Sequence, residues 1–356
     1  MAIASSRKQH QQLIDLPSAS LGARLFLPYP SSTSIGWVLR TGADFPARIK
    51  RCLKSWQCSL VEHGESDKPS TRAKTVYRND LQSKTFEYVT MMLRPMLDHL
   101  KGTPLLASLA FHVMGNSDQL RNEVSSLLQC RKESGIVHRP LIVWEPFPPS
   151  CLPEKYEAFL AVLKMVDVFS PNHIELAQLF GATNGVLTPN QADYKTLVGE
   201  EALTKDVLEN YALQIVRHGI GPSGEGALVL RAAERGCMVV SKRQDPCWLP
   251  AFYDSSSGES SAKIVDPTGA GNAFLGAFTI GYLEKGELIY AACYGNVGAS
   301  FALEQVGVPE LELRLGSTEH WNGADVQGRL SSYRARLQEQ EVVARLRNLD
   351  TSSELI

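Results

Sequence analysis

The chain has 356 residues, of which 44% are hydrophobic and 21% are charged, and its formal net charge at pH 7 is −2. This composition is typical of a globular protein and excludes a disordered or fibrous chain. The small net charge gives no reason to expect a nucleic acid partner. The length suffices for one large α/β domain or for two modest ones.

The N-terminal segment and the cysteines bear on the compartment. Residues 1–17, MAIASSRKQHQQLIDLP, lack an apolar core of signal-peptide length, and no stretch approaches the ~20 apolar residues of a membrane span. The seven cysteines include no Cys-x-x-Cys pair and no zinc-ligand spacing. We therefore expect a cytoplasmic protein with reduced thiols and no membrane partner.

The first hundred residues contain two β-prone segments around a polar turn, at 71–90. They predict a hairpin, which we interpret as a small lid over a sheet. The residues that we expect on its ligand side are Thr75, Tyr77, Phe86 and Tyr88.

From about residue 104 onward, short apolar runs alternate with longer helical patterns. This alternation is typical of a mainly parallel sheet covered by helices on both faces, and it predicts an α/β fold. The predicted strands are 105–115, 140–146, 166–171, 226–234 and 236–242. The predicted helices are 117–133, 152–166, 172–181, 203–218, 287–306 and 325–347.

The segment 264–278, IVDPTGAGNAFLGAF, contains a candidate anion site. A strand that ends in Gly-Ala-Gly and runs into a helix points backbone N–H groups and the positive end of the helix dipole at one place. No Gly-Lys-Ser/Thr follows, and Phe274 stands where a dinucleotide fingerprint has its third glycine. The structural alternative is a tight turn with Asn272 as the helix N-cap.

The same segment resembles the second signature of the PfkB, or ribokinase-like, family of sugar and nucleoside kinases. In that family an Asp and a Thr precede Gly-Ala-Gly-Asp. The residues that fit are Asp266, Thr268, Gly269, Ala270, Gly271 and Phe274, whereas Asn272 replaces the terminal Asp.

Three further stretches resemble the family in order and spacing. Residues 170–181 are similar to its Asn-x-x-Glu element, residues 34–49 to its early strand-turn-helix, and residues 294–307 to the helix beside the adenine. The resemblance extends over residues 34–307. Within the family, the long fungal relatives of the killer-maintenance branch resemble the chain most.

The resemblance implies a ribokinase-like fold with a small β lid, and phosphoryl transfer from ATP to a hydroxyl group of a small acceptor of sugar or nucleoside type. It implies that the amides of Gly269, Ala270 and Gly271 hold the transferring phosphate. Asn172 and Glu175 would orient Mg²⁺ through waters. The remaining implied contacts are Thr268 to the nucleotide, Asn296 to the adenine, and Asp266 to a monovalent cation.

Structural alternatives stay open for three of these residues. Asn172 and Glu175 also have the spacing of a helix N-cap and its N3 residue, which form a capping box. Asn296, between small residues of a helix, is equally a packing contact. Asp266 is equally a residue that stabilises the turn.

Two departures from the family affect function. The Asp that Asn272 replaces is the family's general base, and an amide cannot take the acceptor proton; general-base catalysis is typically worth ~10²–10⁴-fold. In addition, residues 1–20 lack the family's first strand and Gly-Gly turn, so that residues 20–30 would be the end of the helix that follows. A sheet edge left in this way would need a partner, such as a second copy in a homodimer.

We therefore predict a divergent or disordered segment over residues 1–20, a ribokinase-like domain over 21–315, and a helical extension over 316–356. Two functions stay open. The protein is a small-molecule kinase, with activity reduced by Asn272, or a pseudokinase that binds a nucleotide or a protein partner.

Overall fold

The fold is that of a computed structural model, which describes residues 11–14, 18–77, 84–182, 203–253, 262–313 and 318–353. The chain forms two compact units. Unit 1 consists of Met1–Pro17, Tyr29–Ala232 and Met238–Cys247, and unit 2 consists of Ser18–Pro28, Ala233–Cys237 and Trp248–Ile356.

The main sheet of unit 1 has six strands in the order β11-β10-β9-β8-β7-β6, and the neighbours from β6 to β9 are parallel. Ile142, Val143 and Trp144 of β7 are all fully buried. Because consecutive strand residues point to opposite faces, both faces of the sheet are covered here. The strands are β6 Ala110–Gly115, β7 Leu141–Pro146, β8 Val168–Phe169, β9 Ala227–Arg231, β10 Cys237–Ser241 and β11 Gln244–Leu249.

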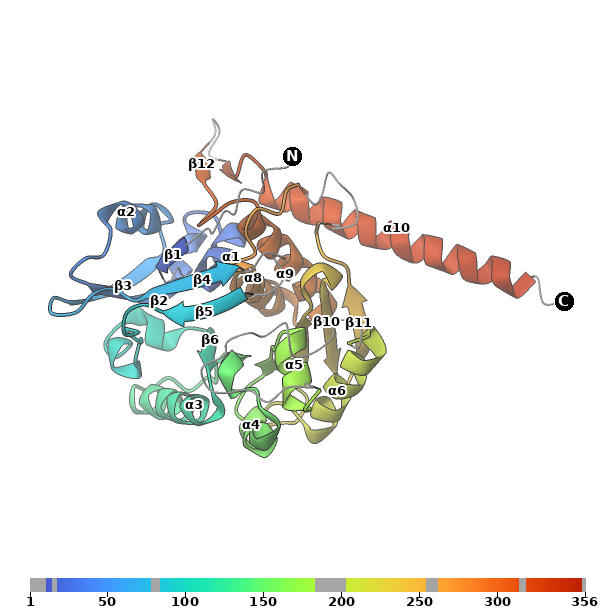
Figure 1. Ribbon diagram of the computed structural model, residues 1–356, viewed down its shortest axis with the longest axis horizontal. Coiled ribbons are helices and arrows are strands. Elements are labelled where there is room, and N and C mark those ends of the chain that lie inside the picture. Colours follow the sequence, from blue (N-terminus) through green and yellow to red (C-terminus); the bar gives the residue numbers. More distant parts are fainter. Residues whose placement is uncertain are drawn as a thin grey trace, which may run out of the picture. The chain divides into compact units, whose positions relative to one another are not determined.

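Four helices, α3 to α6, alternate with the strands β6 to β9 along the chain (Figure 1). Asn116 and Gln119 form a capping box at the start of α3, and Thr204 caps α6, so polar side chains satisfy the first N–H groups of both helices. This alternation confirms the predicted α/β fold with a mostly parallel central sheet. The helices are α3 Ser117–Glu133, α4 Tyr156–Leu163, α5 His173–Leu179 and α6 Lys205–His218.

Two strand predictions differ from the structure. The strand predicted over 105–115 begins only at Ala110, because Pro104–Ala107 forms a 3₁₀ turn with proline at its first position. Strand β11 has no counterpart in the prediction. It contains Pro246, which is unfavourable within a sheet but tolerated on an edge strand, and β11 is an edge strand.

The predicted strand-turn-helix at 34–49 is present as β2 Gly36–Gly42 and α2 Ala47–Ser55, and β2 pairs in parallel with β3 Ser59–Glu65. The hairpin predicted at 71–90 is also confirmed: β4 Arg72–Tyr77 and β5 Lys84–Tyr88 pair antiparallel, and β1 Gln11–Ile14 adds a third strand. Of the proposed ligand-side residues, Tyr88 is 37% exposed, and the side chains of Thr75, Tyr77 and Phe86 lie outside the described part. That the hairpin is a lid stays a prediction.

Unit 2 is mainly helical, and its last helix is the long red one in Figure 1. Half of the residues of α8 and most of those of α9 are buried, in keeping with their small and apolar sequences. The elements are α1 Ser18–Phe26, α8 Ala270–Lys285, α9 Leu288–Leu303, the antiparallel pair β12 Leu311–Leu313 and β13 Glu319–Trp321, and α10 Val326–Ser353.

Helices α1 and α8 pack backbone against backbone. A Cβ atom built on Gly22 of α1 would lie 1.9 Å from the carbonyl oxygen of Ala273, and one built on Gly276 of α8 would lie 1.7 Å from that of Ala19. No side chain fits at either position. These two glycines therefore set how closely the helices approach.

Secondary structure is formed within the N-terminal range: β1 and the first residues of α1 lie within residues 1–20. Helix α1 ends at Phe26, within residues 20–30, where the end of a helix was predicted. That residues 1–20 diverge from the family stays a prediction. The range 316–356 contains the predicted helix, preceded by β13. The domain boundaries themselves stay predictions.

The contact of α1 with α8 predicts an unusual response to a glycine substitution. Gly276→Ala ordinarily stabilises a helix interior by about 1 kcal/mol, but the new methyl group must displace the α1 backbone, and overpacking of this kind costs about 1–3 kcal/mol or more. We expect net destabilisation by about 2 kcal/mol, measured by chemical denaturation. The control is Gly64→Ala in β3, where the new Cβ would lie 3.6 Å from the nearest atom, Thr41 Oγ1. Equal stability of Gly276→Ala and wild type would show that the helices can move apart at no cost.

Candidate functional site

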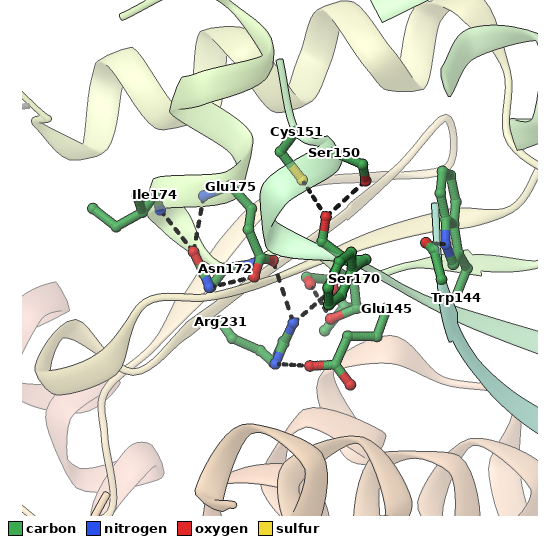
Figure 2. A network of polar contacts seen from close by, with 12 residues as sticks. Trp144, Glu145, Ser150, Cys151, Ser170, Asn172, Ile174, Glu175 and Arg231 are labelled. Carbon is green, nitrogen blue, oxygen red and sulfur yellow. Dashed lines mark hydrogen bonds and ion pairs between the residues drawn. The ribbon is translucent and has the colours of Figure 1, made fainter. Parts of the chain in front are cut away.

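A network of charged side chains lies at the carboxyl end of the unit 1 sheet (Figure 2). Arg231 at the end of β9 donates from Nη1 to Glu145 Oε1 of β7 at 2.7 Å and from Nη2 to the Ser170 carbonyl at 2.9 Å. On the other side of Glu145, Oε2 lies 3.0 Å from His112 Nε2 of β6. Three parallel strands thus converge on one carboxylate. In open α/β sheets, ligands bind outside this end of the strands.

The carboxyl group of Glu145 is ionised despite its burial. Burial raises its pKa, but the charge of Arg231 and the hydrogen bond from His112 outweigh this effect and hold the pKa at about 2. The side chains of Glu145 and Arg231 are only 8% and 11% exposed. An internal ion pair of this kind is costly to break from one side, because the remaining charge has no water to solvate it.

Asn172 and Glu175 form a capping box at the start of α5. Asn172 Oδ1 accepts from the N–H groups of Ile174 and Glu175, both at 2.9 Å, and Glu175 accepts from Asn172 N at 2.7 Å and from Asn172 Nδ2 at 2.6 Å. Figure 2 shows both residues on the same turn. The capping alternative is therefore confirmed, and the role in Mg²⁺ binding stays a prediction.

The surroundings of Glu175 limit how it can act on a metal ion. It is 3% exposed, and Arg231 Nη2 lies 3.6 Å from its Oε2. Direct coordination of Mg²⁺ would require it to give up capping bonds beside a guanidinium, whereas a water-mediated contact would not. Within the described ranges, no cluster of three or more His, Cys, Asp or Glu side chains forms a direct metal site.

The predicted phosphate turn lies in unit 2 and leads into α8. Asp266 is 5% exposed, and its Oδ1 accepts from Thr268 N at 2.9 Å. This bond confirms the turn-stabilising alternative for Asp266 and leaves the monovalent cation a prediction. The structure differs from the expectation at two points: no strand is formed over 264–267, and the N-cap of α8 is Gly269, not Asn272.

Gly269 is required at this N-cap for two reasons. Its φ of +81° lies in the left-handed region, and a Cβ atom built on it would lie 2.6 Å from Ser18 Oγ. The N-cap residue therefore has no side chain that could accept hydrogen bonds from the first N–H groups of α8. Asn272 is displaced into the first helical turn as a result.

The start of α8 has the geometry of an anion site. In the part of the chain that the structure describes, the N–H groups of Gly269, Gly271 and Asn272 have no acceptor, whereas that of Ala270 is 3.3 Å from the Pro267 carbonyl. The first turn contains no acidic residue. Residues 269–272 are partly exposed. Open N–H groups and the helix dipole favour a phosphate at this place, so the residues present fit the predicted ligand.

Asn296 of α9 takes part in internal contacts. Its side chain is 6% exposed, and its Nδ2 lies 2.8 Å from Tyr333 Oη, 3.3 Å from the Pro250 carbonyl and 3.3 Å from Cys237 Sγ. The structure therefore confirms the alternative in which Asn296 makes packing contacts inside unit 2. A contact with adenine stays a prediction, and it would require these bonds to be exchanged.

Glu145, Arg231 and His112 were not predicted as site residues from the sequence. A signal was present: Glu145 and Arg231 each end a buried apolar run, and charged residues at the carboxyl ends of parallel strands are frequent site residues. The candidates that were predicted divide between the units. Asn172 and Glu175 belong to unit 1, whereas Asp266, residues 268–272 and Asn296 belong to unit 2.

Solved structures place the fold in a known class. The chain is similar to a putative Ribokinase II from E. coli in its apo form, with a TM-score of 0.60, 16% identity and 94% of each chain covered. It is also similar to Anopheles gambiae adenosine kinase in complex with P1,P4-di(adenosine-5) tetraphosphate, with a TM-score of 0.58, 16% identity, and 82% and 79% of the two chains covered. These similarities show a ribokinase-like fold.

Residues 33–312 match the pfkB family carbohydrate kinases, and the chain belongs to this family. An uncharacterized protein of Schizosaccharomyces pombe is 28% identical over 92% of this chain and 87% of its own length. Protein MAK32 of Saccharomyces cerevisiae is 23% identical over 85% and 79%. The predicted resemblance to long fungal relatives is thus confirmed. Inositol 3-kinase of Arabidopsis thaliana is 35% identical, but only over 25% of this chain and 22% of its own length.

Among the residues that the structure describes, no helix combines the length and apolar composition needed to cross a membrane. The cytoplasmic location stays a prediction.

The Glu145 network predicts a pH-dependent loss of stability. Glu145→Gln removes one charge and leaves Arg231 charged, which we expect to destabilise the protein by about 3 kcal/mol at neutral pH. Because the pKa of Glu145 is lowered from 4.5 to about 2 on folding, its contribution is present above pH 4.5 and is lost as the pH falls towards 2.

The measurement is denaturant unfolding of wild type and Glu145→Gln between pH 7 and pH 2. The difference between their free energies of unfolding should shrink through this window. The control is Glu62→Gln, which removes an exposed ion pair with Lys50 and should cost less than about 1 kcal/mol. A difference that stays constant down to pH 2 would show that Glu145 is not ionised in the folded protein.

Proposed function

We propose that this protein is an ATP-dependent phosphotransferase that transfers the γ-phosphate to a hydroxyl group of a small polyhydroxyl acceptor. The observation that carries the proposal is the start of α8, where a glycine N-cap leaves backbone N–H groups open and partly exposed. Such groups stabilise the charge that spreads over the phosphoryl oxygens in the transition state. Family membership supports the same chemistry.

Asn272 determines how fast this reaction can be. It stands at the family's general-base position, and its amide cannot take up a proton. Its side-chain oxygen can accept a hydrogen bond from the acceptor hydroxyl and orient it. Because positioning and electrostatics contribute most of the acceleration in phosphoryl transfer, we propose a slow enzyme rather than an inert one.

The alternative is a pseudokinase that binds a nucleotide or a protein partner without turnover. It is favoured by the same Asn272 and by the internal contacts of Asn172 and Glu175, whose side chains already satisfy each other. A nucleotide-binding pseudokinase would require the same phosphate site at the start of α8 and would differ from the enzyme only in that no acceptor is phosphorylated. A pseudokinase that binds only a protein partner would not require a nucleotide at this site.

The ligands follow from this proposal. We propose ATP with Mg²⁺, which Asn172 and Glu175 of unit 1 would orient through waters. The monovalent cation near Asp266 and the homodimer are further proposals. Acceptors to test are sugars and nucleosides, and the partial similarity to inositol 3-kinases adds cyclic polyols.

Nucleotide binding is the first test. We expect ATP with Mg²⁺ at millimolar concentration to raise the melting temperature, because a ligand that binds only the folded state stabilises it. Gly271→Asp should abolish this shift, because it places a carboxylate among the N–H groups that hold the phosphate. The melting temperature without ligand checks that the variant folds. An unchanged ATP affinity in folded Gly271→Asp would mean that the turn has a purely structural role.

Substitution of Asn272 separates the two functions. Asn272→Asp restores a base at nearly the same volume and should raise turnover by ~10²–10⁴-fold if an acceptor site is intact. Asn272→Ala is the matched control, because it removes the hydrogen-bonding oxygen and should lower turnover further. ADP release is measured across sugars, nucleosides and cyclic polyols. Wild type and Asn272→Asp that both bind ATP but phosphorylate no acceptor would establish the pseudokinase.

A further inference from the structure

A nearly buried cation lies near the carboxyl ends of β2 and β3 in unit 1. The side chain of Arg40 on β2 is 9% exposed, and its Nη2 pairs with Glu65 at the end of β3. Its Nη1 lies 2.6 Å from His99 Nε2 and 3.4 Å from the Arg94 carbonyl. His63 stands opposite Arg40 in the pairing of β2 with β3, and its ring centroid lies 4.5 Å from that of His99. One guanidinium and two imidazole rings are therefore gathered at one place.

The contact between Arg40 and His99 fixes the protonation of the His99 ring. A guanidinium can only donate hydrogen bonds, so His99 Nε2 must accept and carries no proton. The ring is therefore neutral, with its one proton on Nδ1, which lies 3.1 Å from the Met96 carbonyl oxygen. A second proton, on Nε2, would remove the hydrogen bond and set two cations against each other.

The surroundings of His99 disfavour this second proton. Burial lowers the pKa of His99 below its ordinary value of 6.5, and the neighbouring Arg40 and His63 act in the same direction. The hydrogen bond to Met96 and the charge of Asp98 have smaller, opposite effects.

The carboxylates near His99 are bonded to other cations. They come from its own turn, from β3, and from α3, which packs against this turn. A proton on His99 would therefore meet no free carboxylate among them. The pairs are Asp98 with Lys101, Glu65 with Arg40 and Lys68, and Glu123 with Arg94.

His99 belongs to a segment that few contacts hold in place, residues 95–103, which we call the flap. Every residue of the flap is at least partly exposed, and its backbone hydrogen bonds are those of local turns. The chain is anchored on both sides: Arg94 donates to the Met114 carbonyl at 2.9 Å, and Leu105 is 7% exposed. In the part of the chain that the structure describes, His99 makes the one side-chain hydrogen bond from the flap to another element.

We propose that His99 is an acid-sensitive switch: its neutral ring holds the flap against β2 and β3, and protonation of the ring releases the flap. Release uncovers Arg40 and His63 near the carboxyl ends of the two strands. The switch is independent of the proposed phosphotransfer. Because the closed flap disfavours the proton, the contact is fully present above pH 6.5 and is lost as the pH falls below this value.

Hydrogen exchange of the full chain tests the switch. The quantity measured is the protection of the flap amides, which is their exchange rate relative to an unfolded chain at the same pH. If only the open flap takes up the proton, with the ordinary pKa of 6.5, the ratio of open to closed flap rises about 10-fold from about pH 7.5 to about pH 5.5. Flap protection should fall by the same factor, and that of β7 should change much less.

Substitution of the histidine identifies the group that titrates. His99→Gln has no proton to take up in this range, so flap protection should become independent of pH. The matched control is His218→Gln in the last turn of α6, which should keep the response of about 10-fold. Flap protection that stays constant in wild type, or that falls equally in His99→Gln, would overturn the switch.

A second measurement uses the unaltered protein, so that a poorly folded variant does not decide the outcome. Titration of the His99 ring by NMR should give a pKa below 6.5, whereas a value of 6.5 or above would overturn the proposal. Arg40→Gln should raise this pKa towards 6.5. Lys50→Gln, which removes an exposed ion pair with Glu62, should leave it unchanged.

Discussion

The architecture of unit 2 depends on the close approach of backbones around α8. Gly22 of α1, Gly276 of α8 and Gly298 of α9 leave no room for a side chain at the contacts. Because packed interiors do not deform freely, these contacts fix the axis and rotation of α8. They therefore also fix the direction of the N–H groups at its first turn. The proposed chemistry of the protein follows from helix packing rather than from a set of reactive side chains.

The two units prepare polar groups for a ligand in different ways. In unit 1, strand ends bring Glu145, Arg231 and His112 together, and each charge in this network has a partner. In unit 2, the donors are backbone N–H groups, which need no partner because they face solvent at a helix start. A network of paired charges is rigid and tolerates no single deletion, whereas a helix start tolerates substitutions that leave its backbone in place.

The sequence predicted what depends on local pattern and left out what depends on distant contacts. The helices of unit 1 were predictable because their caps and apolar spacing are local, as at Asn116. The turn before α8 was recognised from its glycines, but the cap was assigned to Asn272. The positive φ of Gly269 and the proximity of Ser18, which leaves no room for a side chain at Gly269, are not visible in the local sequence pattern. Strand β11 was not predicted because it contains Pro246, and proline within a run argues against a strand unless the strand lies at an edge. The partners of Arg231 and Asn296 lie far away in the sequence, and no local pattern pairs them.

Unit 2 is built from three separate stretches of the chain, and this affects how it can fold during synthesis on the ribosome. Helix α1 ends at Phe26, whereas α8, on which it packs, begins at Ala270. The apolar side chains of Leu21, Leu25 and Phe26 therefore emerge early, and α8 is not yet available to them while Tyr29–Ala232 and Met238–Cys247 of unit 1 are being translated. Exposed apolar helices of this kind are sites for chaperones and for aggregation. The nascent protein can bury its own N-terminal helix only after α8 has left the exit tunnel.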